Sequence, residues 1–190
     1  MNHVAHCFLS YPDAGILFGN FIGDYVKGKA WQAYPPDVQQ GILLHRSIDL
    51  FTDRHPATSR SVARLRPYAG RYTAPVLDVL YDHLLCRRWN EFSAGLSFEA
   101  FADWAYKELD AWSANMPPAL SKRWPQMLAG RFLHGYQNRE GLEWVLRQFS
   151  RRLTIPFEAA ALAEFFFNEI DAFLIDFDDF FPEMQAHVRL

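Results

Sequence analysis

The stretch GILLHRSIDLFTD, residues 41–53, has the pattern of an amphipathic helix with an unusual polar side. His45, Asp49 and Asp53 are spaced by four residues, so on a helix they line one face within reach of each other. Taken alone, this face is expected to be solvated, but the same spacing also suits one wall of a metal site. The apolar residues fall on the side away from His45 and Asp49: Leu43, Leu44, Ile48, Leu50 and Phe51.

The composition indicates one folded domain that spans residues 1–190. Half of the residues are hydrophobic and 16% are aromatic, which excludes a disordered chain. A net charge of -3 gives no indication of a nucleic-acid partner or a polybasic membrane anchor. The sequence does not indicate an oligomeric state.

The cysteines and the terminal segments favour a cytoplasmic protein. Cys7 and Cys86 cannot form a disulfide framework, and the opening MNHVAHCFLS lacks the cationic and long apolar parts of a secretory signal. The aromatic run at residues 164–184 carries an acid every few positions, so we expect it to pack as a terminal amphipathic helix and to span no membrane.

Helical segments follow one another along the chain, with no alternating strand pairs, repeats or linkers. The sequence therefore predicts an all-α fold, a single helical domain of about seven or eight helices. The expected boundaries are an N-cap at Asp13 with a stop at Gly28, a start at Pro35-Pro36-Asp37 with an end at His55-Pro56, a helix from Thr73 to Phe92, and an N-cap at Ser97.

Three acids fall on helical segments that are apolar over most of their circumference. Asp78 and Asp82 share one face of the 73–92 segment, and Asp24 lies in a similar setting within residues 13–28. A helix that is apolar nearly all round is expected to be buried. Burial of an unpaired carboxylate costs several kcal/mol, so these acids need cations, hydrogen-bond donors or a metal ion.

Few positive side chains are interspersed with these acids, mainly Lys27 and Arg46. Histidines at positions 6, 45 and 83 could add nitrogen ligands, and a mixed His/Asp set suits manganese, iron, zinc or magnesium. The alternative is a buried salt-bridge network around Arg46. The sequence by itself leaves both interpretations open.

Several motifs of the chain resemble the acyl carrier protein phosphodiesterase family. They cover the first half densely, and Ser150-Arg151-Arg152 and Phe180-Phe181-Pro182 add thinner support later in the chain. The motifs are M-N-x-x-A-H at 1–6, G-N-x-x-x-D at 19–24, P-P-D-V at 35–38, G-I-x-x-H-R-x-I-D-x-x-T-D at 41–53 and L-D-V-x-x-D-H at 77–83.

The resemblance implies an all-helical, HD-like enzyme, distantly similar to the HD-domain metal phosphohydrolases, that uses a divalent cation, typically manganese. Such enzymes cut the phosphodiester between 4'-phosphopantetheine and a serine of holo acyl carrier protein. The order Asp82-His83 departs from the His-Asp doublet of the HD group, and His3 replaces an expected apolar or aromatic residue. The first departure limits the transfer of individual ligands from HD enzymes, and because of the second we do not count His3 as a site residue.

We hypothesise a site that holds Mn²⁺, with Fe²⁺, Mg²⁺ or Zn²⁺ as alternatives. Asp24 is also a candidate for a catalytic role, Asp53 or Asp78 would orient the attacking water or a ligand histidine, and Arg46 would contact the phosphate. The candidate ligands are His45, Asp49, Asp82 and His83, together with His6 or Asp24.

An acidic carrier protein as substrate implies a docking patch rich in arginine. Each cluster could instead be a solvated face or pair with the acidic C-terminal helix. The candidate clusters are Arg60, Arg64, Arg66 and Arg71; Arg87 and Arg88; and Arg147, Arg151 and Arg152.

Two other functions fit the sequence. One is an HD-type metal phosphohydrolase that acts on a nucleotide or another small phosphoester. The other is a non-catalytic helical adaptor in which the Asp/His cluster is only a buried ionic network.

Overall fold

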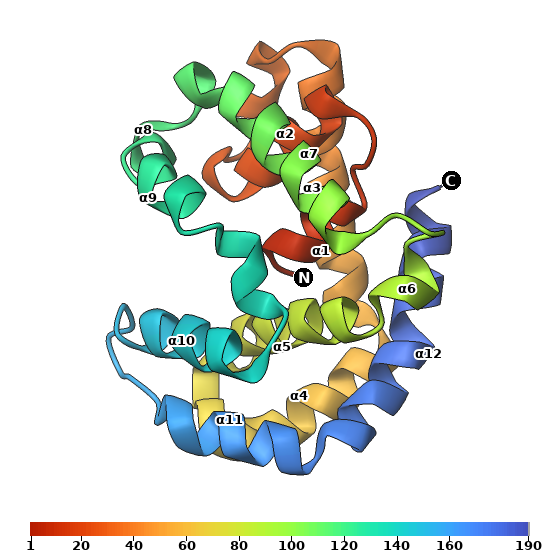
Figure 1. Ribbon diagram of the computed structural model, residues 1–190, viewed down its shortest axis with the longest axis vertical. Coiled ribbons are helices and arrows are strands. Elements are labelled where there is room, and N and C mark those ends of the chain that lie inside the picture. Colours follow the sequence, from red (N-terminus) through yellow and green to blue (C-terminus); the bar gives the residue numbers. More distant parts are fainter. Residues whose placement is uncertain (190) are drawn as a thin grey trace.

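The computed structural model describes residues 1–189, and among these the chain is all-α, as predicted, with no strand (Figure 1). Eight helices have nine or more residues, which matches the predicted number, and shorter helices join them. The α-helices are α1 (His3–Phe8), α2 (Ala14–Ile22), α3 (Pro36–Arg54), α4 (Pro56–Ala69), α5 (Thr73–Arg87), α6 (Trp89–Phe92), α7 (Phe98–Ala111), α8 (Pro118–Ser121), α9 (Trp124–Ala129), α10 (Arg139–Ser150), α11 (Ala159–Asn168) and α12 (Ile170–Val188). The 3-10 helices are η1 (Gly23–Tyr25), η2 (Ala30–Ala33), η3 (Gly70–Tyr72), η4 (Ser113–Asn115) and η5 (Phe132–Tyr136).

Most predicted helix boundaries are confirmed by local contacts. The Asp13 carboxylate accepts a hydrogen bond from the Ile16 amide at 2.8 Å, and Ser97 Oγ accepts one from the Ala100 amide at 3.2 Å. Proline opens α3 and α4, where its fixed φ suits the first turn and its missing N–H costs nothing. His55 between them has extended backbone, which ends α3.

Three predicted helices are shorter than expected. The predicted terminal helix at residues 164–184 is divided at Glu169, where α11 has ended and α12 begins. The helix predicted at residues 13–28 ends at Ile22, because the backbone then tightens into η1 and Val26 is extended, well before Gly28. The 73–92 segment divides at Arg88, whose φ of -97° and ψ of 14° leave the helical region. This break lets the Trp89 ring pack at 5.1 Å from Phe8 in the core.

The orientation of α3 differs from the expectation for its apolar face. Its buried stripe includes His45, whereas Leu43 and Leu50 are 43% and 51% exposed. The reason is the close approach of α2 and α3 at two glycines: a Cβ on Gly41 would lie 2.2 Å from the Ile16 carbonyl oxygen, and one on Gly19 would lie 2.1 Å from the Val38 carbonyl oxygen. Backbone contact with α2 therefore sets the rotation of α3 and turns His45 inward, while Asp49 is half-buried and Asp53 is exposed.

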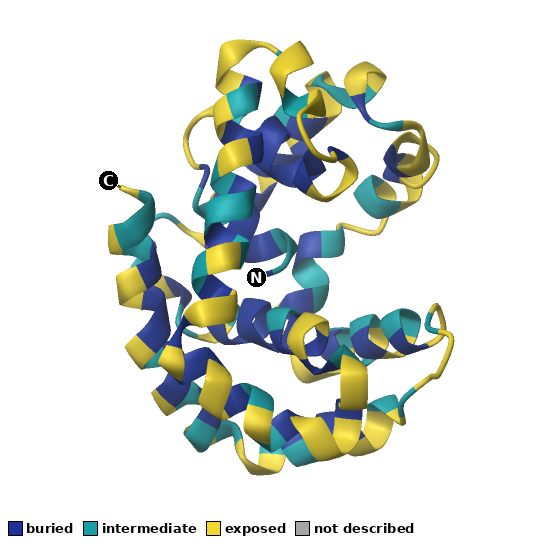
Figure 2. Cartoon of the chain, turned by 180° about the vertical axis from the view of Figure 1, so that it is seen from behind, coloured by how far each residue is buried: buried dark blue, intermediate teal, exposed yellow. Residues whose placement is uncertain are grey.

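The buried apolar side chains form one continuous cluster, with α1 and α5 in the interior and the exposed residues on the outer helix faces (Figures 1 and 2). The C-terminal helix α12 packs on α3, α4 and α5. No helix of residues 1–189 has both the length and the apolar character that crossing a membrane requires.

Three of the candidate docking arginines are used to hold α12. Arg60 and Arg64 of α4 both pair with Asp176, which is 1% exposed, and Arg88 Nη2 lies 2.6 Å from Asp178 Oδ2. The alternative interpretation, pairing with the acidic C-terminal helix, is thus correct for these three arginines.

Candidate metal centre

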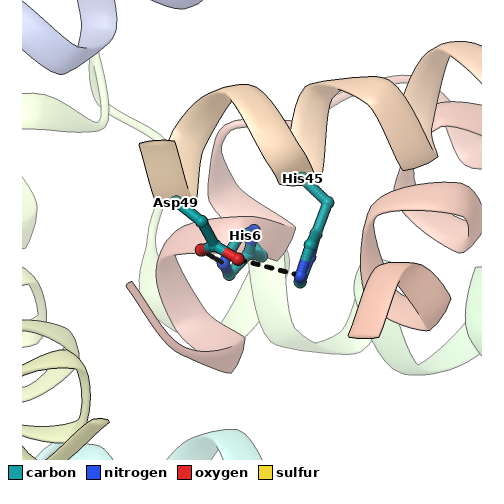
Figure 3. Close-up of side chains that lie close together, drawn as sticks. All are labelled: His6, His45 and Asp49. Carbon is teal, nitrogen blue, oxygen red and sulfur yellow. Dashed lines mark ion pairs between the residues drawn. The ribbon is translucent and has the colours of Figure 1, made fainter. Parts of the chain in front are cut away.

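Three of the predicted ligands meet between α1 and α3. His6 Nε2 lies 3.2 Å from Asp49 Oδ1, and His45 Nε2 lies 3.1 Å from Asp49 Oδ2 (Figure 3). The two imidazole rings are stacked, with centroids 4.3 Å apart. Both histidines are buried, while the Asp49 side chain is 41% exposed, so the cluster is reachable from one side. One potential ligand atom from each residue lies within 4.8 Å of the others.

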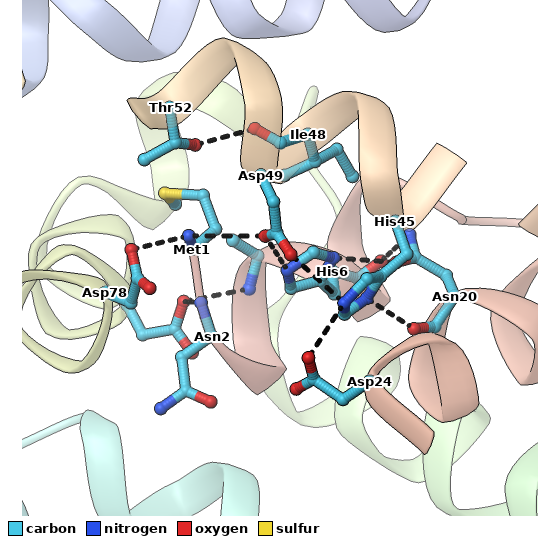
Figure 4. Close-up of polar contacts among 12 residues, drawn as sticks. Met1, Asn2, His6, Asn20, Asp24, His45, Ile48, Asp49, Thr52 and Asp78 are labelled. Carbon is cyan, nitrogen blue, oxygen red and sulfur yellow. Dashed lines mark hydrogen bonds and ion pairs between the residues drawn. The ribbon is translucent and has the colours of Figure 1, made fainter. Parts of the chain in front are cut away.

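Asp24 extends this cluster toward solvent. Its Oδ1 lies 3.4 Å from His45 Nε2, and its side chain is 80% exposed (Figure 4). The prediction that Asp24 is buried on an apolar helix was wrong, because α2 ends at Ile22 and Asp24 sits on the following 3-10 turn. A Cβ on the preceding Gly23 would lie 2.3 Å from His45 Cγ, so glycine lets this turn approach the histidine.

Asn20, which the sequence interpretation missed, orients both histidines. Its carbonyl oxygen lies 2.8 Å from His45 Nδ1, and its Oδ1 lies 2.7 Å from His6 Nδ1. Asn20 Nδ2 donates to the His6 carbonyl at 3.0 Å and to Ser10 Oγ at 2.9 Å, which fixes the orientation of the amide. Both Nδ1 atoms therefore donate their protons, and the Nε2 atoms of the neutral rings are left with lone pairs.

These lone pairs point at carboxylate oxygens, an arrangement that needs a proton or a metal ion. His45 Nε2 is buried and, despite the short distances, has no hydrogen bond of acceptable geometry. The facing nitrogen and oxygen atoms are 3.1–3.4 Å apart, which suits two ligands of one ion. Two neighbouring ligand atoms that are each about 2.1 Å from a metal ion lie roughly 3 Å from each other. The residues present thus fit a divalent cation.

The charges of the cluster also favour a divalent cation. Burial lowers the pKa of His45, but the adjacent Asp24 and Asp49 outweigh it and raise that pKa to about 9. For His6, burial dominates and the pKa is lowered. One proton on His45 therefore leaves the Nε2 atom of His6 without a proton or ion. A second proton, on His6, would place two positively charged rings face to face. A divalent ion can bind both Nε2 atoms and neutralise the carboxylates.

Asp82 has a different set of partners. It is fully buried, and its oxygens accept hydrogen bonds from the amides of Asn2 at 3.2 Å, Val4 at 2.6 Å and Ala5 at 3.2 Å. Burial raises its pKa to about 7 against the opposing effect of these donors. Asp82 thus caps the first turn of α1 and holds the helix that carries His6. The sequence predicted that this buried carboxylate requires a cation, hydrogen-bond donors or a metal ion, and backbone amides supply the donors.

Asp53 and Asp78 lie beside the cluster on the other side of Met1. The Met1 amino group donates to Asp78 Oδ1 at 2.7 Å and lies 4.0 Å from Asp49 Oδ1 (Figure 4). Asp53 is exposed, and it lines with Asp78 a cavity of about 530 Å³. The structure brings neither acid into contact with His6 or His45.

His83 and Arg46 also have partners outside the cluster. His83 Nδ1 lies 2.8 Å from the Tyr136 carbonyl oxygen, and its ring packs edge-on against Phe166 and Phe167. Arg46 Nη2 donates to the carbonyls of Val26 and Gly28, so it fixes the loop that follows Asp24. Within residues 1–189 no ion pair joins Arg46 to an acid, which argues against the alternative of a salt-bridge network around it.

Comparison with known proteins agrees with the resemblance noted in the sequence. A family model described as acyl carrier protein phosphodiesterase matches residues 1–184. An acyl carrier protein phosphodiesterase of Enterobacter sp. (strain 638) is 32% identical over 152 residues, 80% of this chain and 79% of that protein. One from Salmonella agona (strain SL483) is 29% identical over 189 residues, 98% of this chain and 96% of that protein. No solved structure matches, and the similarity to HD enzymes stays a prediction.

Proposed function

The chain therefore belongs to the acyl carrier protein phosphodiesterase family, and from this premise we propose that it releases 4'-phosphopantetheine from holo acyl carrier protein by metal-dependent hydrolysis. As a member of this family it is a phosphoric diester hydrolase, which removes the non-catalytic adaptor from consideration. The observation that carries the metal dependence is the pair of buried Nε2 atoms facing two carboxylates.

In the proposed site, His6, His45, Asp49 and Asp24 hold the ion, most simply Mn²⁺, with Fe²⁺, Mg²⁺ or Zn²⁺ as alternatives. The ion supplies positive charge for the phosphodiester and lowers the pKa of water from about 15.7 towards about 7. Asn20 keeps both imidazoles in the tautomer that can bind it. A ligand role for Asp82 and His83 stays a prediction. The backbone partners of Asp82 favour a structural role, whereas His83 Nε2 is buried and has no hydrogen-bond partner among residues 1–189.

The exposed end of the cluster is where a phosphodiester can reach it. Asp24 lies there, and a carboxylate that is 80% exposed can accept the proton of an attacking water. Asp78 and Asp53, across Met1, are candidates to orient that water from the neighbouring cavity. Arg46 steadies the Asp24 loop through its carbonyls, and a direct contact of Arg46 with the phosphate stays a prediction.

Metal affinity is expected to rise with pH. In the metal-free protein His45 is protonated below its raised pKa of about 9, so binding must release that proton. One released proton strengthens binding by up to about tenfold per pH unit between about pH 6 and 8. Titration calorimetry of Mn²⁺ in buffers of different ionisation enthalpy would measure both the affinity and the proton release. An affinity that stays constant over this range would contradict a proton on His45.

The docking surface is proposed to consist of the predicted arginines that α12 does not use. Within residues 1–189, none of these pairs with an acid: Arg66, Arg71, Arg87, Arg147, Arg151 and Arg152. Charge-steered association accelerates encounter by about 10- to 1000-fold and is screened by salt. We therefore expect kcat/KM on holo carrier protein to fall at least about tenfold between roughly 50 and 500 mM NaCl. The control is a small phosphodiester substrate, which has no protein surface to dock and should keep its rate. An equal fall in kcat/KM for both substrates would count against docking by charge.

The proposed reaction is tested by incubating the protein with holo acyl carrier protein and Mn²⁺, followed by intact mass measurement. The carrier protein should lose the phosphopantetheine mass, and a chelator should prevent the loss. Parallel reactions with nucleotides and other small phosphoesters test the alternative of an HD-type phosphohydrolase. Efficient cleavage of a nucleotide with an intact holo carrier protein would support that alternative and reject our proposal.

A further inference from the structure

A second cavity, of about 340 Å³, opens between α9, η5 and α10. These elements lie on the same side of the molecule, with η5 connecting the other two (Figure 1). The volume is within the range of about 300–1,000 Å³ usual for small-molecule sites. Trp144 of α10, which lines it, is 57% exposed, a high value for so large an apolar side chain.

The inner wall of this cavity adjoins the candidate metal centre. His3 lines the cavity and stands one helical turn before His6 on α1. Its ring packs against Phe21 of α2 at 5.6 Å and against Phe132 of η5 at 5.3 Å. Asn2, next to it, donates from Nδ2 to the Tyr136 hydroxyl, another lining residue, at 3.2 Å. The same short helix thus carries a metal ligand candidate and a cavity wall.

The lining combines apolar surface with free amide groups. Met127, Phe132, Trp144 and Val145 supply apolar contacts. Gln126 and Gln148 also line the cavity, and neither forms a side-chain hydrogen bond to another of residues 1–189. Two arginines, Arg123 and Arg152, also line the cavity, and neither has an acidic partner in the described part of the chain.

We propose that this cavity, the arm cavity, binds the pantetheine part of the substrate. The inference rests on the proposed function and names the subsite for the group that is released. A pantetheine arm has a branched apolar portion followed by two amides, which match the apolar residues and the two free carboxamides. Its phosphate end would lie toward His3 and the metal centre, and the cationic Arg123 and Arg152 suit both the anionic phosphate and an acidic carrier protein.

The larger cavity fits this arm less well. It is lined by Asp53, Asp78 and Arg66 with small alcohol and aliphatic side chains, and it has no aromatic residue or carboxamide. Two carboxylates there repel the phosphate end, and one of them is already paired with the Met1 amino group. Charge and lining thus both favour the arm cavity.

The binding test uses free pantetheine as the probe and titration calorimetry as the readout. Wild-type protein should bind pantetheine, and Trp144→Ala should weaken the binding at least about tenfold. Ile175→Ala is the matched control, because Ile175 is 64% exposed on α12 and lies outside the cavity. It should bind as the wild type does. No binding by the wild type, or equal binding by Trp144→Ala, would overturn the proposal.

A kinetic test separates the arm cavity from the metal centre. Trp144→Ala should raise KM for holo carrier protein about tenfold, whereas Ile175→Ala, outside the cavity, should keep the KM and kcat of the wild type. An unchanged KM would reject the arm cavity while the release reaction stands. A wild-type protein that binds pantetheine but does not release 4'-phosphopantetheine from holo carrier protein would reject the proposed function and keep the cavity assignment.

Discussion

Replacing His45 with alanine is expected to remove metal binding and to lower the turnover of holo carrier protein by more than about 100-fold. Loss of a residue that only hydrogen-bonds to a metal ligand already lowers metal affinity or activity by about 10- to 100-fold. His45 has its Nδ1 fixed by Asn20 and its Nε2 within 3.4 Å of both Asp49 and Asp24, so alanine removes the nitrogen that both carboxylates face. Metal content after dialysis against Mn²⁺ and the rate of phosphopantetheine release measure the two effects.

The control for this substitution is His187→Ala. His187 also contacts α3, through Ser47 Oγ at 2.8 Å, but it lies outside the cluster. This variant should keep both metal and activity. A folded His45→Ala protein with near-normal turnover would remove His45 from the proposed site.

Replacing Asp82 with alanine is expected to lower the free energy of unfolding by at least about 2 kcal/mol, because each buried N–H left unsatisfied costs about 1–3 kcal/mol. Three amides at the start of α1 depend on this carboxylate. Urea denaturation of the metal-free protein measures the loss. Asp53→Ala, at an exposed position of α3, is the control and should change stability by less than about 0.5 kcal/mol.

The metal-free condition separates a structural role for Asp82 from a role as ligand. A residue that only binds metal would leave the stability of the metal-free protein unchanged when replaced. Such a result for Asp82→Ala would favour the ligand role over capping. The observed partners predict the opposite result, with the loss present before any metal is added.

Much of the fold could be predicted because its signals are local. Asp13, Ser97 and the prolines before α3 and α4 act within one turn of where they stand, so the sequence places them correctly. The end of α2 could not be predicted in this way. Gly23, which follows the end of α2, packs against His45, a residue 22 positions away in the chain, and the spacing of residues along the chain does not predict such a contact.

The rotation of α3 was a second long-range effect. Its leucines suggested that the polar side faces water, but the glycine contact with α2 turns His45 inward and leaves Leu43 and Leu50 exposed. Asn20 had a signal that could have been used: a fully buried amide in an otherwise apolar helix needs partners on several sides. Spacing along the chain could group Asp82 and His83 with the other candidates, but it could not reveal that the N-terminus of α1 occupies Asp82.

The most direct test of the metal centre is a crystal of the protein soaked in MnCl₂ and measured for anomalous scattering from manganese. Our account predicts a manganese peak about 2.0–2.4 Å from His6 Nε2, His45 Nε2 and an Asp49 oxygen. A manganese peak only at Asp53 or Asp78, with the Nε2 atoms of His6 and His45 unbound, would contradict it.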